Sequence, residues 1–121
     1  MGANVHLPAP RRARYQAAMF LVVFRNRKRA DIDSAAYALD ADAMEALSRA
    51  QPGFISFKSY ASEDSEVIAL SEWVDEAAAL AWRRVASHAQ VQAKGRSAYY
   101  ESYTLFAGTP SRVHHFTWDQ A

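Results

Sequence analysis

The stretch QPGFISFKSYASEDSEVIALSEW, residues 51–73, decides the fold of this chain. Two segments rich in β-branched and aromatic residues, Phe54 to Ser62 and Glu66 to Trp73, flank the polar turn Glu63-Asp64-Ser65, and this pattern is typical of a β-hairpin. The Pro-Gly pair before the hairpin ends any preceding helix, because proline cannot continue a helix and Gly53 permits a turn. The centre of the chain is therefore predicted to be an antiparallel pair of strands.

The hairpin is preceded by a strand and a helix and followed by a helix and a strand. These predicted elements are a strand over residues 15–25, a helix over 31–51, a helix that begins after Asp75, and a strand over 98–106. Asp31, Asp33 and Ser34 are possible N-caps of the first helix, and Asp75 can cap the second. The order βαββαβ predicts an α+β, ferredoxin-like fold, in which both helices cover one face of a four-stranded antiparallel sheet.

The composition is that of one globular domain. The chain has 121 residues, half of them hydrophobic, and a net charge of +1. We expect an N-terminal arm over residues 1–14, a domain over 15–107 and a C-terminal tail over 108–121. The absence of cysteine excludes disulfides, thiolate zinc sites and cysteine nucleophiles. Neither a glycine-rich phosphate loop nor a GxSxG nucleophile motif is present.

Basic residues gather between positions 11 and 29, where no acidic residue occurs. The segment resembles a signal peptide, but its apolar run, Ala17 to Phe24, is short, lacks a cleavage site and is followed at once by further basic residues. This run is also too short to span a membrane. We therefore expect a cytoplasmic protein with no membrane partner. Nucleic acid is not an expected partner, because the net charge is near zero and four of the seven basic residues adjoin a strand end.

The predicted sheet has more apolar surface than two helices can cover. The first strand is apolar on both faces, and the last strand carries Tyr99, Tyr100, Tyr103 and Phe106. Each buried aromatic side chain contributes about 150–250 Å², so several left exposed would exceed the patch that a monomer tolerates. The same face of a second copy can cover them, and we therefore expect a homodimer that pairs sheet to sheet. A small apolar or aromatic molecule would then bind between the sheet and the helices of each protomer.

His88 lies in the stretch WRRVASHAQVQAKGR, residues 82–96, on the same predicted helical face as Ala77, Ala81 and Val85. In an unbroken helix it would be a core histidine bonded to a backbone carbonyl. However, Ser87-His88-Ala89-Gln90 fits the S-x-x-Q capping box, which predicts a helix break at Ser87 with His88 in the first turn of a new helix. The positive end of that helix would favour a neutral imidazole, which can accept a proton or bind a metal.

Other residues are candidates for either packing or a site. Trp73 and Trp82 are close in sequence, and a buried indole N–H needs a partner, which can be a ligand atom. The tyrosines of the last strand divide between its two faces. His114 and His115 are a poor metal site, because adjacent residues on an extended segment point to opposite sides and no carboxylate stands at a suitable spacing. No metal is expected.

The motifs QPGF, EVIALSEW, AWRRVASHAQVQAKGR and AYYESY together resemble the antibiotic biosynthesis monooxygenase domain family, whose members are dimers of the dimeric α+β barrel superfamily. The likeness covers about residues 15–107. It is strongest to a bacterial subgroup in which this helix ends W-R-x-x-x-x-H-x-x-x-Q-x-x-G-R. The resemblance implies either oxidation of an aromatic or quinone-like substrate by O₂ without a cofactor, or binding and degradation of haem.

The resemblance also suggests roles for particular residues. His88, Trp73 and Trp82 are the candidate catalytic residues, and Asn26, Phe57, Tyr99 and Tyr103 are the candidate substrate-binding residues. In haem-degrading relatives the haem ligand would correspond to His88, with Trp82 and Asn26 beside it, but the interval from Trp82 to His88 is shorter here. The aromatic oxidisers carry a polar amide before the tryptophan of the third strand, where this chain has Ala69 and Ser71. Three hypotheses follow: a cofactor-independent oxygenase, a haem protein, and a dimeric binding domain without catalysis.

Overall fold

The computed structural model describes residues 19–92 and 98–119, with the side chains of residues 88–92 left out. Its elements are β1 (Phe20–Lys28), α3 (Ser34–Arg49), β2 (Phe54–Ala61), β3 (Val67–Trp73), α4 (Glu76–Gln92) and β4 (Tyr100–Gly108). The predicted order βαββαβ is therefore confirmed. The predicted N-terminal arm over residues 1–14 lies outside the described residues.

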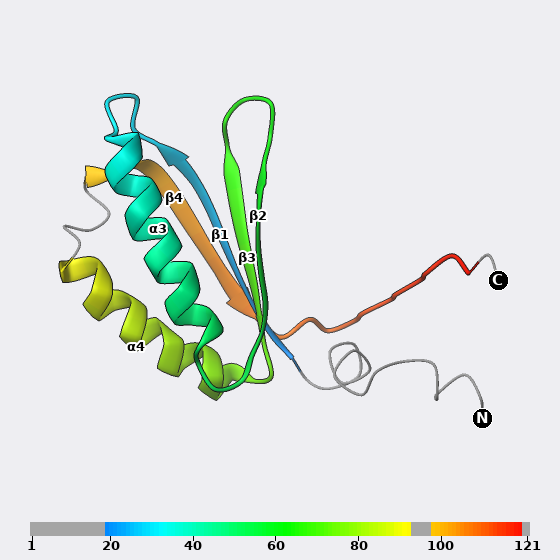
Figure 1. Cartoon of the computed structure of the whole chain (residues 1–121). Helices are drawn as coiled ribbons and strands as arrows, with labels where there is room; N and C mark the ends of the chain where they lie inside the picture. The colour runs from blue at the N-terminus through cyan, green and yellow to red at the C-terminus, as the bar shows by residue number, and fades with distance from the viewer. Residues whose placement is uncertain (1–18, 93–97, 120–121) are drawn as a thin grey trace.

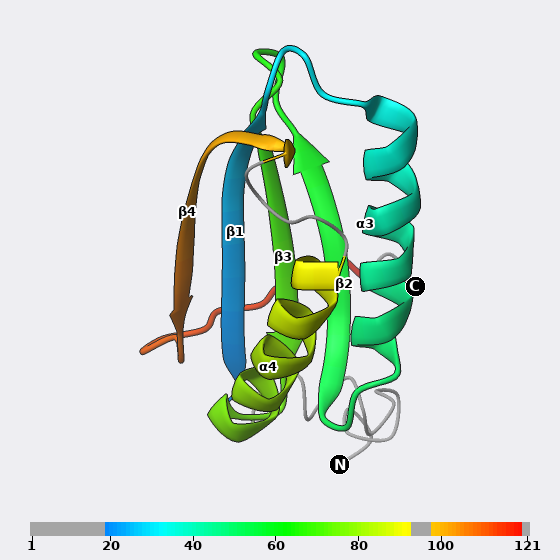
Figure 2. The same ribbon diagram turned by 90° about the vertical axis from the view of Figure 1, so that its left-hand side faces the viewer.

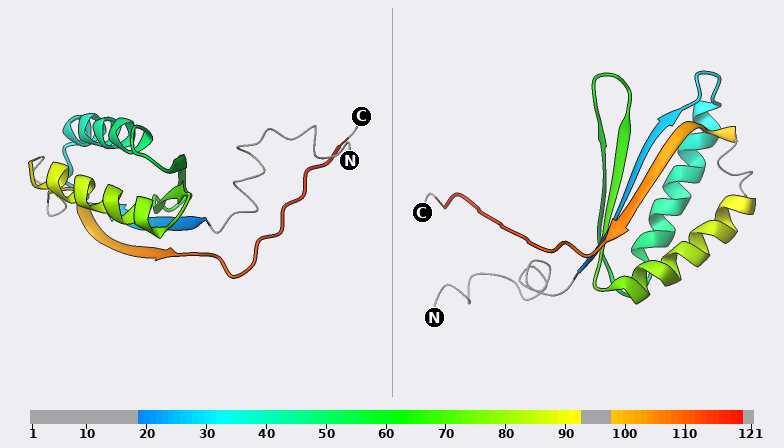
Figure 3. Two further views of the ribbon diagram at one scale, coloured as in Figure 1. Left: turned by 90° about the horizontal axis from the view of Figure 1, so that it is seen from below. Right: turned by 180° about the vertical axis from the view of Figure 1, so that it is seen from behind.

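The four strands form one antiparallel sheet in the order β2-β3-β1-β4. Both described helices lie on the same face of this sheet, and within residues 19–92 and 98–119 the other face carries no helix (Figure 1). The view from below in Figure 3 shows the same two layers. This is the ferredoxin-like arrangement expected from the sequence. Neither of the two described helices is long and apolar enough to cross a membrane.

Local sequence signals explain where several elements begin. Asp33 is the N-cap of α3, because its Oδ1 accepts a hydrogen bond from the backbone N–H of Ala36 at 3.0 Å. Asp75 does the same for α4, accepting from the N–H of Ala78 at 2.9 Å. Gly53 has a φ of +82°, which is the left-handed conformation that glycine adopts without strain. These predicted caps and the predicted turn are confirmed.

Two predictions about the helices and strands are wrong. The strand expected to end at Arg25 continues to Lys28. Asn26 pairs with both β3 and β4, and Arg27 pairs with β4. The predicted helix break at Ser87 does not occur, since α4 runs unbroken to Gln92. The capping box therefore lies within a helix that already satisfies its backbone groups, and a local motif does not interrupt such a helix.

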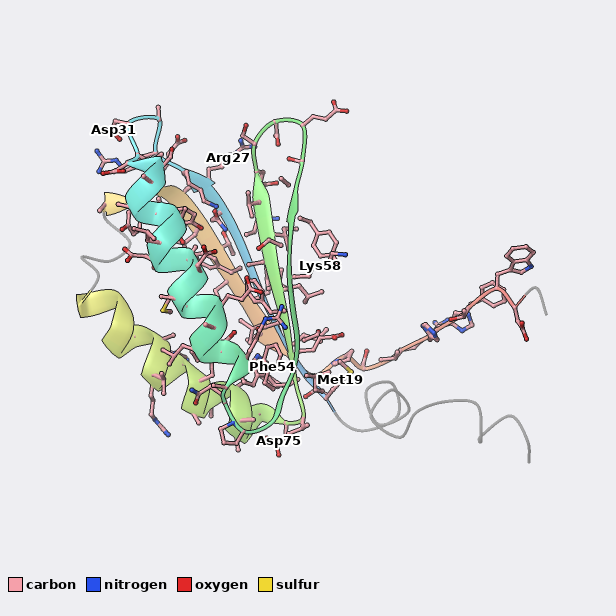
Figure 4. The ribbon with its side chains drawn as sticks, viewed as in Figure 1. Met19, Arg27, Asp31, Phe54, Lys58 and Asp75 are labelled. Atoms are coloured by element: carbon pink, nitrogen blue, oxygen red, sulfur yellow. The ribbon has the colours of Figure 1, made fainter. Side chains whose placement is uncertain are left out.

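The sheet has two ends, which we name by the elements there. Figure 4 shows Met19, Phe54 and Asp75 at the α4 end, where β1 begins and α4 starts, and Arg27 and Asp31 at the opposite end. We call this opposite end the hairpin end, because the turn between β2 and β3 lies there (Figure 1). The two ends are separated by the nine residues of β1, or about 30 Å.

The basic residues of the hairpin end are paired. Arg27 binds the carboxylate of Asp64 at 2.6 Å, and Arg29 binds Asp31 at 2.9 Å. Hydrogen bonds from the Ser62 hydroxyl and then from the Arg27 guanidinium lower the pKa of Asp64, and the Arg29 guanidinium lowers the pKa of Asp31. This part of the basic segment thus fastens the end of β1 to the hairpin turn and to the loop before α3.

Candidate functional site

Two groups of side chains lie between the sheet and the helices, one near each end of the sheet. The register decides which residues face the helices: Phe20 pairs with Trp73, and Asn26 lies six residues further along β1. Because successive side chains alternate, Phe20, Phe24 and Asn26 share the face that carries Trp73. Asn26 and Trp73 are thus on the same face but about 20 Å apart along the strand.

The group at the α4 end is built around Trp73, which is completely buried. Its ring stacks on that of Trp82 from α4, with centroids 6.0 Å apart and planes at 20°, and meets Phe54 edge to face at 5.5 Å. The indole N–H of Trp73 donates to the Ser71 hydroxyl at 2.9 Å. Trp73 therefore joins the sheet to α4, and its one hydrogen-bond donor is used within the chain.

A bulge in β2 adds aromatic surface to this face. Phe54 pairs with Trp73 but Ser56 pairs with Glu72, so one extra residue stands in β2. Phe54 and Phe57 consequently both lie on the helix side, although they are three residues apart. Phe57 pairs with Ser71 and is half-buried. The predicted substrate residue Phe57 thus belongs to the apolar lining under the helices.

The group at the hairpin end, which we call the lysine–tyrosine cluster, consists of Phe24, Asn26, Lys28, Tyr37, Tyr99, Tyr100 and Tyr103. Its residues come from β1, α3 and β4, with Tyr99 immediately before β4. The buried amide of Asn26 is fixed by weak hydrogen bonds from Nδ2 to the carbonyls of Phe24 and Val67, at 3.3 and 3.4 Å. Its Oδ1 accepts a hydrogen bond from Lys28 Nζ at 2.7 Å.

The Lys28 ammonium lies among aromatic rings. Its Nζ is 4.9 Å from the centroid of Tyr37 and 5.8 Å from that of Tyr100, within the range of cation–π attraction. Lys28 and Asn26 are two residues apart on β1 and point to the same side of it. An ammonium has three N–H donors, and the bond to Asn26 uses one of them. A positive charge with further donor capacity therefore stands at the polar end of an aromatic wall.

Two tyrosines of the cluster, Tyr99 and Tyr100, have pKa values above the ordinary value for tyrosine. Burial and a hydrogen bond with Tyr37 raise the pKa of Tyr100 far above its ordinary value. A hydrogen bond from the Tyr99 hydroxyl to the Asp40 carboxylate raises the pKa of Tyr99. The predicted substrate residue Tyr99 is thus held by α3 through Asp40 and by its edge-to-face contact with Tyr37 at 5.2 Å.

The helices leave β4 open on the side of the cluster. Tyr103 and Leu105 pair with Asn26 and Phe24, so they lie on the helix side of β4, yet they are 41% and 52% exposed in the described structure. Figure 2 shows why, because α4 lies in front of β1 and β3, α3 stands beside β2, and β4 is at the opposite edge of the sheet. The Tyr103 ring contacts Phe24 at 5.2 Å. The aromatic wall is therefore accessible from the β4 side.

The family to which this fold belongs follows from comparison with known proteins. The model of the antibiotic biosynthesis monooxygenase family matches residues 19–94, which is more than half of the chain and includes β1 through α4. The chain belongs to the antibiotic biosynthesis monooxygenase family. Residues 95–121, with β4 and the C-terminal tail, lie beyond the matched range.

Individual proteins and solved structures are also similar to this chain. The chain is 36% identical to Bacillus subtilis (strain 168) YqjZ over 69 residues, and this match spans 57% of the chain and 60% of YqjZ. The structure of Rv0793 from Mycobacterium tuberculosis is also similar: the match covers 80% of this chain and 99% of the Rv0793 chain, with 23% identity and a TM-score of 0.63. The match to the structure of SnoaB, a cofactor-independent oxygenase from Streptomyces nogalater, covers 80% of this chain and 97% of the SnoaB chain, with 18% identity and a TM-score of 0.62. The two structures show the shared fold.

Not every predicted site residue of this family member can be placed. His88 is in the last third of α4, and its side chain lies outside the described residues. Its predicted role therefore stays a prediction. Trp73 and Trp82 lie together at the α4 end, whereas Asn26, Tyr99 and Tyr103 lie together at the hairpin end. The structure thus brings the predicted residues into two groups and not into one.

Four members of the lysine–tyrosine cluster were not predicted as site residues from the sequence: Phe24, Lys28, Tyr37 and Tyr100. Lys28 was counted only as one of a run of basic residues, although it has the same strand parity as Asn26 and Phe24. This alternation could have placed Lys28 beside Asn26, but only if the strand had been predicted to continue beyond Arg25. Tyr37 and Tyr100 carried no signal of their own, since their meeting depends on how α3 packs over β1 and β4.

Proposed function

We propose that this family member is a cofactor-independent monooxygenase that acts on a small aromatic or quinone-like substrate. The observation that carries the proposal is the Lys28–Asn26 pair at the polar end of an aromatic wall that is open beside β4. Family membership supports the same reaction class. An apolar surface with a few convergent polar groups is the usual form of a small-molecule site.

The chemistry requires a substrate that becomes electron-rich when it loses a proton. A methylene group conjugated with a ketone, as in an anthrone or in the keto tautomer of a phenol or naphthol, loses a proton to a base, and the resulting anion carries its charge largely on the ketone oxygen. Electrons then pass to O₂, a carbon–oxygen bond forms, and loss of water leaves a new carbonyl. The CH₂ group and O₂ thus become C=O and H₂O, so no external reductant is needed.

In this proposal Lys28 binds the negatively charged oxygen of the substrate and Asn26 orients the ammonium. The charge of Lys28 is most effective where aromatic side chains exclude water, and Tyr37 and Tyr100 provide such surroundings. Tyr103 and Phe24 would hold the rings of the substrate, and Phe57 and Trp82 would continue the wall toward the α4 end. His88 remains the predicted proton acceptor.

Oxygen uptake in the presence of phenols, naphthols and anthrones tests this function. We expect uptake with at least one of these compounds, and we expect Lys28→Met to lower kcat/KM by about 10²–10³, as for the loss of other groups that stabilise an oxyanion. Lys58→Met is the matched control, because Lys58 also lies over a tyrosine ring, that of Tyr60 at 5.5 Å, but on the helix-free face (Figure 4).

The outcomes separate the hypotheses. Equal activity of the Lys28→Met and Lys58→Met variants would show that the ammonium of Lys28 takes no part. Binding of a compound without oxygen uptake would indicate a binding domain without catalysis. No uptake and no binding with any of the compounds would contradict the proposed substrate class.

The haem hypothesis receives little support from the described residues. It requires Asn26 and Trp82 to approach one haem, but Trp82 stacks on Trp73 at the α4 end while Asn26 is engaged by Lys28 at the hairpin end. Titration with hemin distinguishes the two functions: a Soret shift that is lost in His88→Ala would favour a haem protein.

A homodimer is part of the proposal. The helix-free face exposes apolar side chains, among them Tyr60, Ile68 and Phe106, and sheet-to-sheet pairing of two copies would cover them. The cytoplasmic location expected from the sequence is also proposed. The dimer is tested by measuring the molar mass across a range of protein concentrations.

A further inference from the structure

The C-terminal arm, residues 109–119, is a described segment that belongs to neither layer of the domain. It follows β4 without forming a helix or strand. Figure 1 shows it leaving the α4 end of the sheet and extending toward the side without helices, and the view from behind in Figure 3 agrees. The arm therefore points into the space that faces the helix-free surface of the sheet.

The arm carries large apolar side chains that the chain leaves in solvent. Phe116 is 75% exposed, Trp118 is 70% exposed, and Val113 is about half exposed. Exposed aromatic side chains at this density on a short segment are typical of an interaction site, since scattered single residues are the normal case on a surface. Trp and Phe are also among the residues enriched in protein interfaces.

The helix-free face offers the complementary surface. It carries exposed Tyr60, Ile68 and Phe106, and the register places them on β2, β3 and β4. Phe106 is two residues before the end of β4, so this apolar face continues directly into the arm. Charged residues on the same face are engaged within the chain: Arg25 lies 5.2 Å from the Phe106 centroid and 3.9 Å from Glu66, and Glu72 accepts a hydrogen bond from the Ser56 hydroxyl.

We propose that the arms are exchanged between two copies of this chain, so that residues 109–119 of one protomer pack against the helix-free side of the other. This inference rests on the homodimer proposed above and specifies how it is held. Phe116 and Trp118 are the anchors. Each protomer gives one arm and receives one, which is the reciprocal contact that a two-fold axis requires.

Length and area are both sufficient for this arrangement. Eleven extended residues span about 35 Å, whereas four strands are only about 15–20 Å wide, so one arm is long enough to reach exposed residues of a partner beside the area where the two sheets meet. The six exposed side chains of face and arm together present about 500–800 Å² of surface. A stable interface buries about 800 Å² per partner, so these residues supply most of it. A second copy is therefore favoured over an unrelated protein, because one chain carries both complementary surfaces.

Photo-crosslinking in mixed dimers tests the exchange. A photoreactive phenylalanine analogue is placed at position 116 of the full chain, and copies labelled with heavy nitrogen are mixed with unlabelled copies and equilibrated. We expect crosslinks that join a heavy peptide to a light one and that map to β2, β3 or β4. The matched control places the analogue at Leu39, which is 73% exposed on α3 and should give no crosslink between copies.

A second measurement tests the anchors. We expect Trp118→Asp to raise the Kd of the dimer by at least about 30-fold, as for other aromatic hot spots, and Leu39→Asp to leave it unchanged. Both substitutions are at exposed positions, and urea unfolding verifies that each variant is folded.

The outcomes distinguish the inference from the proposals on which it rests. Crosslinks within single copies only, or a dimer whose arm makes no crosslink, would overturn the exchange and leave the sheet-to-sheet dimer standing. A monomer at every concentration would overturn both. Neither measurement depends on oxygen uptake, so the proposed monooxygenase activity is judged separately.

Discussion

Gly53 provides the sharpest test of how the sequence builds this fold. Its φ of +82° is a conformation that costs a residue with a side chain about 1–2 kcal/mol. A Cβ added there would lie 2.6 Å from Ala78 Cβ and 2.9 Å from Val74 Cγ2, closer than carbon atoms approach without a shift of the structure. Relieving such overlap in a packed region costs about 1–3 kcal/mol.

Gly53→Ala should therefore lower the free energy of unfolding by about 2–5 kcal/mol. This is a large part of the roughly 5–15 kcal/mol that stabilises a domain. In urea unfolding at one fixed protein concentration, the midpoint should fall by roughly 1–2 M, because the slope for small proteins is about 1–3 kcal/mol per M. The cost arises at a point of close contact, where the carbonyl of Gly53, just before β2, accepts a hydrogen bond at 2.9 Å from the N–H of Val74, between β3 and α4.

Gly108→Ala is the matched control, since a Cβ at that position meets no atom of the chain within 4 Å. It should leave the midpoint unchanged or raise it slightly, because alanine restricts the unfolded chain. If the two substitutions shift the midpoint equally, or if Gly53→Ala costs less than about 1 kcal/mol, the explanation by positive φ and close packing is wrong.

Three further predictions concern hydrogen bonds and charge. Ser71→Ala should cost about 1–3 kcal/mol in urea unfolding, because the buried indole N–H of Trp73 would lose its acceptor; a neutral effect would mean that another group accepts this hydrogen bond. Asp33→Ala should cost about 0.5–2 kcal/mol through loss of the α3 N-cap, and Asp33→Asn, which preserves the cap, is its control. The pKa of Asp64 is lowered in the folded protein, so its contribution to stability is complete above the ordinary pKa of about 4 and is lost as the pH falls below that value. Asp64→Asn should flatten the pH dependence of unfolding in this acid range, and an unchanged profile would contradict the assignment.

Much of the fold could be predicted from residues that act locally. Asp33 and Asp75 begin their helices because a carboxylate can accept from a backbone N–H three residues ahead, and this depends on a few neighbouring positions only. Gly53 ends the region between α3 and β2 for an equally local reason. The capping box at Ser87 is the exception, because the continuing helix satisfies the same backbone groups and overrides the motif.

The sequence by itself determined the order of the elements and the existence of apolar surface on both faces of the sheet. Only the tertiary structure decided how the site residues are grouped. The pairing of β1 with β3 and β4 sets Asn26 beside Tyr103 and places Trp73 six residues away. The packing of α3 brings Tyr37 to Lys28 and brings Asp40 to Tyr99. Register and helix packing are long-range properties, since each depends on residues tens of positions apart that local patterns do not compare.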